Sequence, residues 1–402
     1  MISENQIYSG FSCPQVGLDK EFLELVVTEH ARQTVQKFIE CYNGRMEIRG
    51  RGLGSVLSNW LQCTDTFETV WNSGFGEVFA AVFRNGAQDI ERRAAMLALR
   101  LHECGHAGEW EQQLSKPVRF RFDRWLLPPA DTIEVSATPQ AVMLNMRTAN
   151  FWRKTTFQRS ENGWETNNGA EALMVLTRPG IRWTILTAES LAASSTALLQ
   201  TEVLGYGDAD VDTQPELLLH TCDAAVSLIA EFADIYLPWV SNVIRDLVPL
   251  RARPGIFSSG SIDLSPGVVC VSNSVSNHEN PWALAEVLVH EATHQYLYIA
   301  RRLGRMDDGK DDTLYFSPFR NTGRPIYNIL ITYHAFANVV LFYRTALAHG
   351  QSADGTSALV VQERVKELEQ TLQPLEQALQ STRSLTPLGL ALWEPLRGQL
   401  QS

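Results

Sequence analysis

The most informative stretch of the chain, residues 281–303, reads PWALAEVLVHEATHQYLYIARRL. It contains no glycine, and its one proline comes first, where a helix tolerates proline because no N–H donor is needed there. Asn280, the residue before it, is a favoured N-cap. Gly304 follows it, and glycine is common just after the last helical turn. The sequence therefore predicts a helix from near Pro281 to about Leu303.

The centre of this predicted helix carries the pattern HExxH, with histidines at 290 and 294 and a glutamate at 291. Residues four apart lie on one face of a helix, so two such imidazoles can converge on one metal ion. Leucines and valines before the motif predict a buried and therefore rigid helix. We interpret His290 and His294 as metal ligands, and Glu291 as a proton-handling group beside an open coordination position. The alternative is a pair of ordinary core histidines.

A second HExxH string runs from His102 to His106. Gly105 lies inside it and Gly108 follows, and each glycine costs a helix about 1 kcal/mol relative to alanine. The pattern indicates a helix that ends here among solvated polar residues. We interpret His102 and His106 as surface or helix-terminal histidines.

A third metal ligand has to come from elsewhere in the chain. The extended zinc-peptidase pattern would need glycine and histidine where Leu297 and Ala300 stand, and no glutamate occurs between His294 and Val361. His334 is the one ligand-grade residue on a further apolar helix, predicted over about residues 326–349. We predict it as the third ligand. Three imidazoles leave coordination positions open, which suits either zinc hydrolysis or iron chemistry with oxygen.

Two arginines lie in the segment between the two predicted helices, which reads YFSPFRNTGRP over residues 315–325. A guanidinium binds a carboxylate through two parallel hydrogen bonds. Arg320, Arg324 or the later Arg344 could therefore hold the far carboxylate of a dicarboxylic cosubstrate such as 2-oxoglutarate. In a peptidase, an arginine could instead hold the substrate's C-terminus. The alternative is that these arginines pair with the aspartates nearby.

Composition narrows the class of protein. The chain has 402 residues and a net charge of -11, which argues against a nucleic-acid partner because such binding needs a basic face. Its 6 cysteines are scattered, as expected for reduced thiols. The first residues lack the pattern of a signal peptide, and no run of 18 apolar residues suggests a membrane span. We expect a cytoplasmic protein without a membrane partner.

The pattern of apolar residues predicts an α+β fold that is predominantly helical. Three regions are expected: a helical N-terminal region (1–115), a mixed α/β middle region with a small strand-rich part (116–254), and an HExxH metal-binding catalytic region (255–402). In the last region, the HExxH helix is expected to pack against a second helix. Apolar residues at helical spacing over Leu359–Ser381 predict either a packed helix or an oligomer interface, which Pro374 ends or kinks.

The motifs together resemble a known family. The likeness lies in PGVVCV (266–271), LVHEATHQ (288–295), YFSPFR (315–320) and Arg324-Pro325, with a weaker likeness in GFSCP (10–14). These segments are similar to the HExxH-motif enzymes found with ribosomally made, modified peptides, which are described as iron(II)- and 2-oxoglutarate-dependent peptide β-hydroxylases. One departure is that the family's later histidine corresponds to Ile331, three residues before His334.

The resemblance implies hydroxylation at the β-carbon of a residue in a precursor peptide. Iron(II) would be held by His290, His294 and His334, and 2-oxoglutarate by Arg320 or Arg324. The middle region would bind the peptide, for instance by strand addition to a sheet edge. Two alternatives stay open: a zinc metallopeptidase with Glu291 as general base, and a non-catalytic peptide-binding protein with a vestigial metal site.

Overall fold

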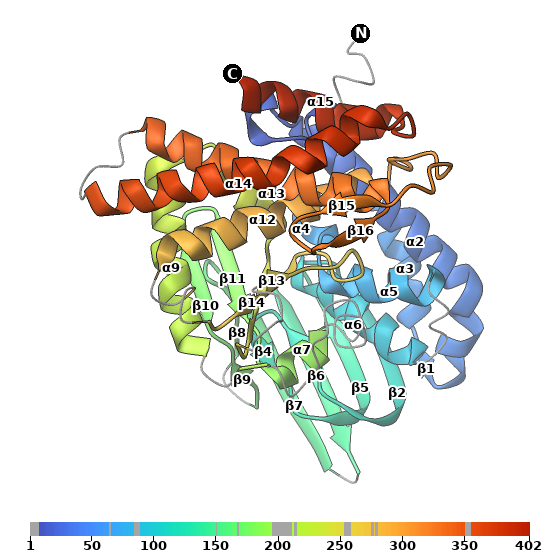
Figure 1. Cartoon of the computed structure of the whole chain (residues 1–402). Coiled ribbons are helices and arrows are strands. Elements are labelled where there is room, and N and C mark those ends of the chain that lie inside the picture. The colour runs from blue at the N-terminus through green and yellow to red at the C-terminus, as the bar shows by residue number, and fades with distance from the viewer. Residues whose placement is uncertain are drawn as a thin grey trace. The chain divides into compact units, whose positions relative to one another are not determined.

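A computed structural model gives the structure of the chain (Figure 1). It describes residues 8–63, 66–83, 89–149, 151–166, 169–194, 211–212, 215–252, 259–274, 277, 280–349 and 355–402. The chain divides into two compact units. The first comprises residues 1–26, 220–244 and 274–402, and the second comprises residues 27–219 and 245–273.

These units differ from the three consecutive regions predicted from the sequence. The second unit takes in the strands β12 (Asp246–Leu250) and β14 (Val268–Ser272), which pair in parallel with each other. Strand β12 also pairs with β11 (Ile181–Ile185), which comes some 60 residues earlier. Pairing between strands far apart in the sequence leaves no mark on local periodicity, so a division by sequence order could not find these units.

The first unit is mainly helical. Its complete elements are the 3-10 helix η1 (Pro14–Val16), the helices α10 (Tyr236–Val243), α12 (Pro281–Ala300), α13 (Ile326–Ala348), α14 (Gly355–Ser381) and α15 (Pro387–Gln401), and a hairpin of β15 (Tyr315–Ser317) and β16 (Thr322–Arg324). Helix α13 packs against α12, α14 and α15, and α12 also packs against α10. The predicted pairing of the HExxH helix with a second helix is thus confirmed.

Helix α12 forms where its sequence predicts it. The Asn280 side chain accepts a hydrogen bond from the backbone N–H of Trp282, and Pro281 occupies the first turn. The helix ends at Ala300, and the next three residues form a turn before Gly304. Most of its side chains are buried, so its position is fixed by packing on several sides.

Helix α13 is the core helix of the first unit. Among the described residues, it is the one helix whose length and composition would allow it to cross a membrane, but 78% of its apolar stretch is buried inside the protein. Such burial is what the core helix of a soluble protein shows. Because α13 is buried over most of its length, its sequence has no polar face.

Helix α14 confirms the packed-helix interpretation of the tail. Val361, Leu368 and Leu375 are at most 3% exposed, and α14 packs against α13. Of the two outcomes expected at Pro374, an end of the helix is wrong, because α14 continues to Ser381, and a kink stays a prediction. Packing of the apolar stripe outweighs the one backbone hydrogen bond that proline removes.

The second unit is built on sheets. The largest has the order β1-β2-β5-β6-β7-β8 and is antiparallel throughout, the second is mixed with the order β10-β11-β12-β14-β13, and the third has the order β3-β4-β9. The strands not yet given are β1 (Gly50–Arg51), β2 (Gly108–Val118), β3 (Arg121–Phe122), β4 (Trp125–Leu126), β5 (Ala130–Ala137), β6 (Ala141–Thr148), β7 (Phe151–Ser160), β8 (Gly163–Thr166), β9 (Glu171–Ala172), β10 (Val175–Arg178) and β13 (Ser259–Gly260).

Helices precede and interrupt these sheets. They are α3 (Leu53–Trp60), α4 (Phe67–Val70), α5 (Ser73–Phe83), α6 (Ile90–Glu103) and α7 (Ala188–Ser194). Helices α2 (Lys20–Ile48) and α9 (Pro215–Phe232) each have residues in both units. The predicted helical region to residue 115 was too long, because α6 ends at Glu103 and β2 begins at Gly108. In β2 the side chains of Trp110, Gln112 and Leu114 are buried alternately, which is the period of a strand.

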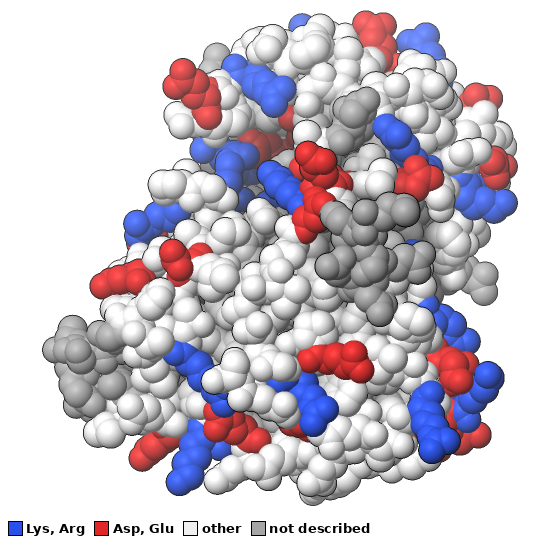
Figure 2. All heavy atoms as spheres, turned by 90° about the horizontal axis from the view of Figure 1, so that it is seen from above, with Lys and Arg blue, Asp and Glu red and all other residues white. Residues whose placement is uncertain are grey.

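The fold is therefore α+β with more helix than strand among the described residues, as the sequence predicted. The strand-rich part is larger than expected and contains a sheet of six strands. On the face seen in Figure 2, acidic and basic side chains are interspersed in small groups, with uncharged surface between them.

Candidate metal site

The two histidines of α12 lie side by side on the partly exposed face of an otherwise buried helix. Their Nε2 atoms are 3.1 Å apart, and the ring planes are nearly perpendicular, at 89°. Two nitrogen ligands that each lie about 2.0–2.1 Å from one metal ion are separated by roughly 3 Å. The spacing of His290 and His294 therefore fits two ligands of one ion.

Burial keeps both rings neutral. It lowers the pKa of His290 to about 4, with smaller contributions from the positive charges of Arg320 and Arg364. The pKa of His294 is also lowered well below its usual value, first by burial and then by its neighbour His290. A neutral imidazole is the form that can bind a metal ion.

Glu291 lies beside this pair. Its side chain is 2% exposed, and its Oε1 is 4.0 Å from His290 Nε2. The carboxylate is thus close to His290 Nε2, although neighbouring positions on a helix diverge by about 100°. This position suits a group that exchanges a proton with a molecule at the site, which is the role predicted from the sequence.

His334 lies on α13 and is fully buried. Its Nε2 is 2.9 Å from the backbone oxygen of Phe11, and its Nδ1 is buried with no hydrogen-bond partner among the described residues. Its charge would lower the pKa of His294, so the two rings lie within electrostatic reach of each other. However, the described residues include no group of three His, Cys, Asp or Glu side chains close enough to hold a metal ion. The role of His334 as third ligand stays a prediction.

The arginine-bearing segment forms the β15–β16 hairpin. Arg320 lies in its turn, and Arg324 in β16 pairs with Tyr315 of β15. Partial burial lowers the pKa of Arg320, and so does the positive charge of Arg324, so the two guanidinium groups are near each other. An anion bound between them would offset this repulsion.

Two further charged residues near the hairpin or on α13 make other contacts. Arg344 forms an ion pair with Glu369 at 2.8 Å and donates a hydrogen bond to the backbone oxygen of Leu400, so it is not a cosubstrate clamp. Asp311, in the acidic loop, accepts hydrogen bonds from the hydroxyls of Tyr315 and Thr382. That aspartate anchors the base of the hairpin.

Aromatic rings lie next to the histidine pair. Phe319 in the hairpin turn stacks on Phe336 of α13, with ring centroids 3.7 Å apart and an interplanar angle of 6°. Phe336 in turn meets the ring of His290 edge-on at 4.6 Å. This stack links the hairpin to the metal-site helix and gives one side of the site an apolar wall.

The first HExxH string is built differently. The helix ends at Glu103, and Gly105 adopts a φ of +96°, so the string does not continue as a helix. His102 is buried, contrary to the expectation of solvated surroundings. Its Nδ1 lies 2.7 Å from the backbone oxygen of His106, and its Nε2 accepts a hydrogen bond from the indole of Trp110 at 2.9 Å. Both ring nitrogens are in use, so this histidine has none to offer a metal ion.

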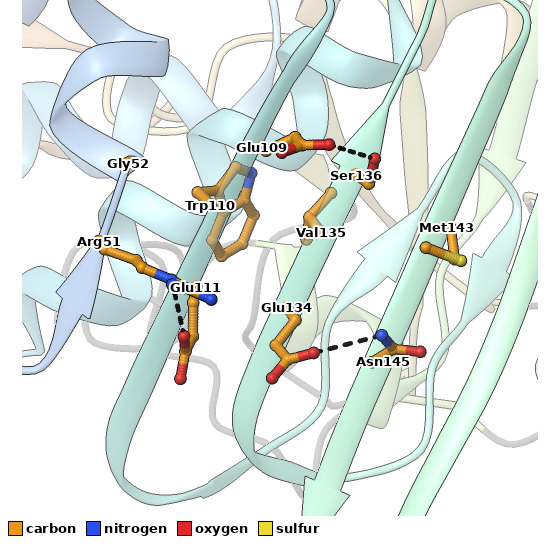
Figure 3. Close-up of a pocket in the computed structure, with 10 residues that line it drawn as sticks. All are labelled: Arg51, Gly52, Glu109, Trp110, Glu111, Glu134, Val135, Ser136, Met143 and Asn145. Atoms are coloured by element: carbon orange, nitrogen blue, oxygen red, sulfur yellow. Dashed lines mark hydrogen bonds and ion pairs between the residues drawn. The ribbon is translucent and has the colours of Figure 1, made fainter.

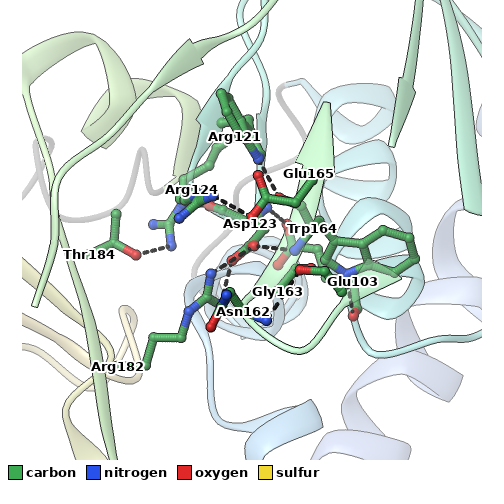
Figure 4. Close-up of polar contacts among 12 residues, drawn as sticks. Glu103, Arg121, Asp123, Arg124, Asn162, Gly163, Trp164, Glu165, Arg182 and Thr184 are labelled. Atoms are coloured by element: carbon green, nitrogen blue, oxygen red, sulfur yellow. Dashed lines mark hydrogen bonds and ion pairs between the residues drawn. The ribbon is translucent and has the colours of Figure 1, made fainter. Parts of the chain in front are cut away.

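Glu103 belongs to a buried ionic network in the second unit (Figure 4). One of its carboxylate oxygens accepts from Arg100 at 2.7 Å and the other from the backbone N–H of Asp123 at 2.6 Å. Asp123 in turn binds both terminal nitrogens of Arg182. Burial raises the pKa of Glu103 despite the positive charge of Arg100. The network joins the end of α6 to the turn between β3 and β4 and to strand β11, which is a structural role.

The burial of His102 makes stability dependent on pH. Burial lowers its pKa from 6.5 to about 4, so the unfolded chain takes up the proton more readily. The contribution of the buried neutral His102 to the unfolding free energy is fully present above pH 6.5 and is lost as the pH falls toward 4. His102→Asn keeps a donor toward the His106 carbonyl and removes the titration. Between these pH values we expect the wild type to lose roughly 3 kcal/mol more unfolding free energy than the variant. Chemical denaturation at each pH measures the unfolding free energy of both proteins. An equal dependence of that free energy on pH in the wild type and in His102→Asn would refute the prediction.

A pocket in the second unit was not foreseen from the sequence (Figure 3). It has a volume of about 450 Å³ and lies over strands β1, β2, β5 and β6. Glu111 and Glu134 face each other across the β2–β5 pair; Glu111 pairs with Arg51 at 3.0 Å and Glu134 accepts from Asn145 at 3.2 Å. The alternation of glutamates with buried residues is the signal that marks this face. Each of these two carboxylates already has a partner.

A search against models of known protein families gave no match, and a search of curated proteins gave no significant match.

Proposed function

We propose that the chain is an iron(II)- and 2-oxoglutarate-dependent oxygenase that hydroxylates the β-carbon of a residue in a ribosomally made peptide. The observation that carries the proposal is the convergence of His290 and His294, whose Nε2 atoms are 3.1 Å apart on a rigid helix, with the positive charge of Arg320 acting on both rings. A pair of metal-binding histidines with a cationic group beside it suits an anionic cosubstrate that also binds the metal.

Neutral imidazole nitrogens are ligands that suit the implied metal. Both rings of the pair are neutral, and the buried Nδ1 of His334 is a further imidazole nitrogen with no other partner among the described residues. His290, His294 and His334 would hold iron(II). When bound, the metal supplies the oxygen chemistry in which O2 and 2-oxoglutarate are converted to succinate and CO2 while one oxygen atom enters a C–H bond of the peptide.

The chain's own residues bind and orient the reactants. Arg320, with Arg324 beside it, would hold the C5 carboxylate of 2-oxoglutarate through paired hydrogen bonds. Glu291 would accept or return a proton next to His290 Nε2, from which it is 4.0 Å away. The stacked rings of Phe319 and Phe336 would exclude water from one side of the site.

The substrate class and the location in the cell follow from the resemblance of the HExxH helix and the SPFR loop to peptide-modifying enzymes. The precursor peptide would be the partner, and the cytoplasm, where ribosomal peptides are made, the site of action. An oligomer through α14 is not needed for the stability of that helix, because its apolar stripe already packs on α13.

Anaerobic loading with iron(II) followed by addition of O2 and 2-oxoglutarate tests the proposal. We expect succinate to form, more rapidly when a precursor peptide encoded beside the protein is added, and the peptide to gain the mass of one oxygen atom. The matched sample contains zinc(II) instead of iron(II) and should form no succinate. Peptide cleavage in the zinc sample, with no turnover in the iron sample, would support a metallopeptidase and overturn the oxygenase. Failure to bind either metal would leave a vestigial site.

A further inference from the structure

The segment Phe11–Cys13 is a buried part of the first unit, and all three of its residues are 0% exposed. It lies against α13 through two hydrogen bonds to its backbone oxygens. The Phe11 oxygen lies 2.9 Å from His334 Nε2, and the Ser12 oxygen accepts from Asn338 Nδ2 at 2.8 Å. A segment distant in sequence thus contacts α13 at two positions that are one helical turn apart.

Asn338 holds this arrangement together. Its Nδ2 donates both to the Ser12 oxygen and to the backbone oxygen of His334, at 2.8 and 2.9 Å. Its own backbone oxygen accepts from the hydroxyl of Tyr236 at 3.0 Å. The side chain is fully buried, so its hydrogen bonds fix the position of the segment relative to the histidine.

The contact with Phe11 determines which nitrogen of His334 carries the proton. A backbone carbonyl oxygen can only accept a hydrogen bond, so the Nε2 atom facing it must be the protonated one. The neutral ring then has its lone pair on Nδ1, which is buried and has no hydrogen-bond partner among the described residues. Metal-binding histidines commonly have this form, with one nitrogen donating to a carbonyl and the other free for the metal.

We propose that the segment Phe11–Cys13 is a positioning element for the metal site: it locks His334 in the Nε2–H tautomer and presents Nδ1 as the metal-binding nitrogen. Asn338 is the positioning residue that anchors the segment. The metal-binding part of this inference rests on the proposed function, whereas the tautomer can be tested without any metal. The HExxH motif alone would not indicate that residues 11–13 take part in the metal site.

The tautomer is tested first, by nitrogen NMR of the metal-free full chain labelled at its histidines, with His334→Gln used to assign the signal. We expect His334 to be protonated at Nε2 in the wild type. In Asn338→Ala, the loss of the anchor should give a mixture of tautomers. Thr345→Val is the matched control on the same helix, because among the described residues its hydroxyl donates to the backbone oxygen of Leu341 alone. A ring protonated at Nδ1 in the wild type would overturn the inference.

Cobalt(II) titration, followed by its visible absorption, tests the second part. Loss of an outer hydrogen-bond partner of a metal-binding histidine weakens metal affinity by about 10–100-fold. We expect a loss in this range for Asn338→Ala, a larger loss for His334→Gln, and no change for Thr345→Val. The glutamine amide can still donate to the Phe11 oxygen, so His334→Gln retains the docked segment while removing Nδ1.

The outcomes separate the two proposals. If His334→Gln weakens cobalt binding and Asn338→Ala, folded as judged by circular dichroism, does not, the positioning role is wrong and the metal site stands. If Asn338→Ala does not fold, the wild-type tautomer still decides the first part. If the wild type binds no metal, the proposed function fails, while an Nε2–H ring at 334 would still support the lock.

Discussion

Replacing His294 with alanine is expected to remove bound iron from the protein and, with it, the turnover of 2-oxoglutarate. The two Nε2 atoms of the pair are 3.1 Å apart, as expected for two ligands of one ion. Removal of either ring would therefore leave the ion with one ligand from α12 and not two. Since loss of an outer-shell partner already weakens metal affinity by about 10–100-fold, loss of a ligand should weaken it by more than roughly 100-fold. His290→Ala should have the same effect. Metal content after dialysis and succinate formation measure both consequences.

His349→Ala is the matched control, because this histidine is exposed at the C-cap of α13 and should change neither metal content nor turnover. His102→Asn is a second control, since its ring nitrogens are engaged with His106 and Trp110 in the other unit. Retention of iron by both α12 variants would mean that the HExxH helix is not the metal site. Loss of iron from His102→Asn, with α12 variants unaffected, would move the site to the first HExxH string.

The sequence predicted helix α12 well because its signals are local. The N-cap Asn280, the proline after it and the uninterrupted run to Ala300 act within one helix, and α12 forms as expected. The same holds for the spacing of His290 and His294, since helical geometry alone brings residues four apart together. Local geometry also explains why the glycine after His102 indicated a helix end.

The environment of each site residue could not be predicted, because it depends on contacts between distant parts of the chain. The hydrogen bond between His334 and Phe11 joins residues 323 positions apart. The ion pair that occupies Arg344 comes from Glu369 on another helix. The burial of His102 likewise depends on the indole of Trp110 in strand β2. The sequence had assigned the start of this strand to the helical N-terminal region.

The order of the sheets was also beyond local reasoning. Strands β5, β6 and β11 lie within the middle region, where the sequence predicted a strand-rich part. The parallel pairing of β12 with β14, and of β12 with β11, joins segments separated by helices and loops. Such pairings are selected by packing of whole elements, so only the three-dimensional structure reveals that the late strand 268–272 belongs with the middle of the chain.

Arg320→Gln is expected to raise the KM for 2-oxoglutarate strongly while leaving iron binding intact. A hydrogen bond to a charged group contributes about 1.5–3 kcal/mol, which corresponds to a change in affinity of roughly 10–100-fold. Arg320→Lys keeps the charge but not the planar fork, so its KM should lie between those of the wild type and the glutamine variant. Turnover at several 2-oxoglutarate concentrations, with iron content measured on the same samples, separates binding of the cosubstrate from binding of the metal.

The structure also ranks the two candidate arginines. The positive charge of Arg320 acts on both histidine rings, whereas Arg324 affects the pKa of Arg320. Arg324→Gln should therefore raise the KM less than Arg320→Gln. The exposed Arg383, in the loop between α14 and α15, provides the charge-matched control Arg383→Gln, which should leave the KM unchanged. If Arg320→Gln changed only the KM for a cleaved peptide, the hairpin would hold a substrate C-terminus, as a metallopeptidase requires. An unchanged KM in both hairpin variants would mean that the cosubstrate carboxylate is held elsewhere.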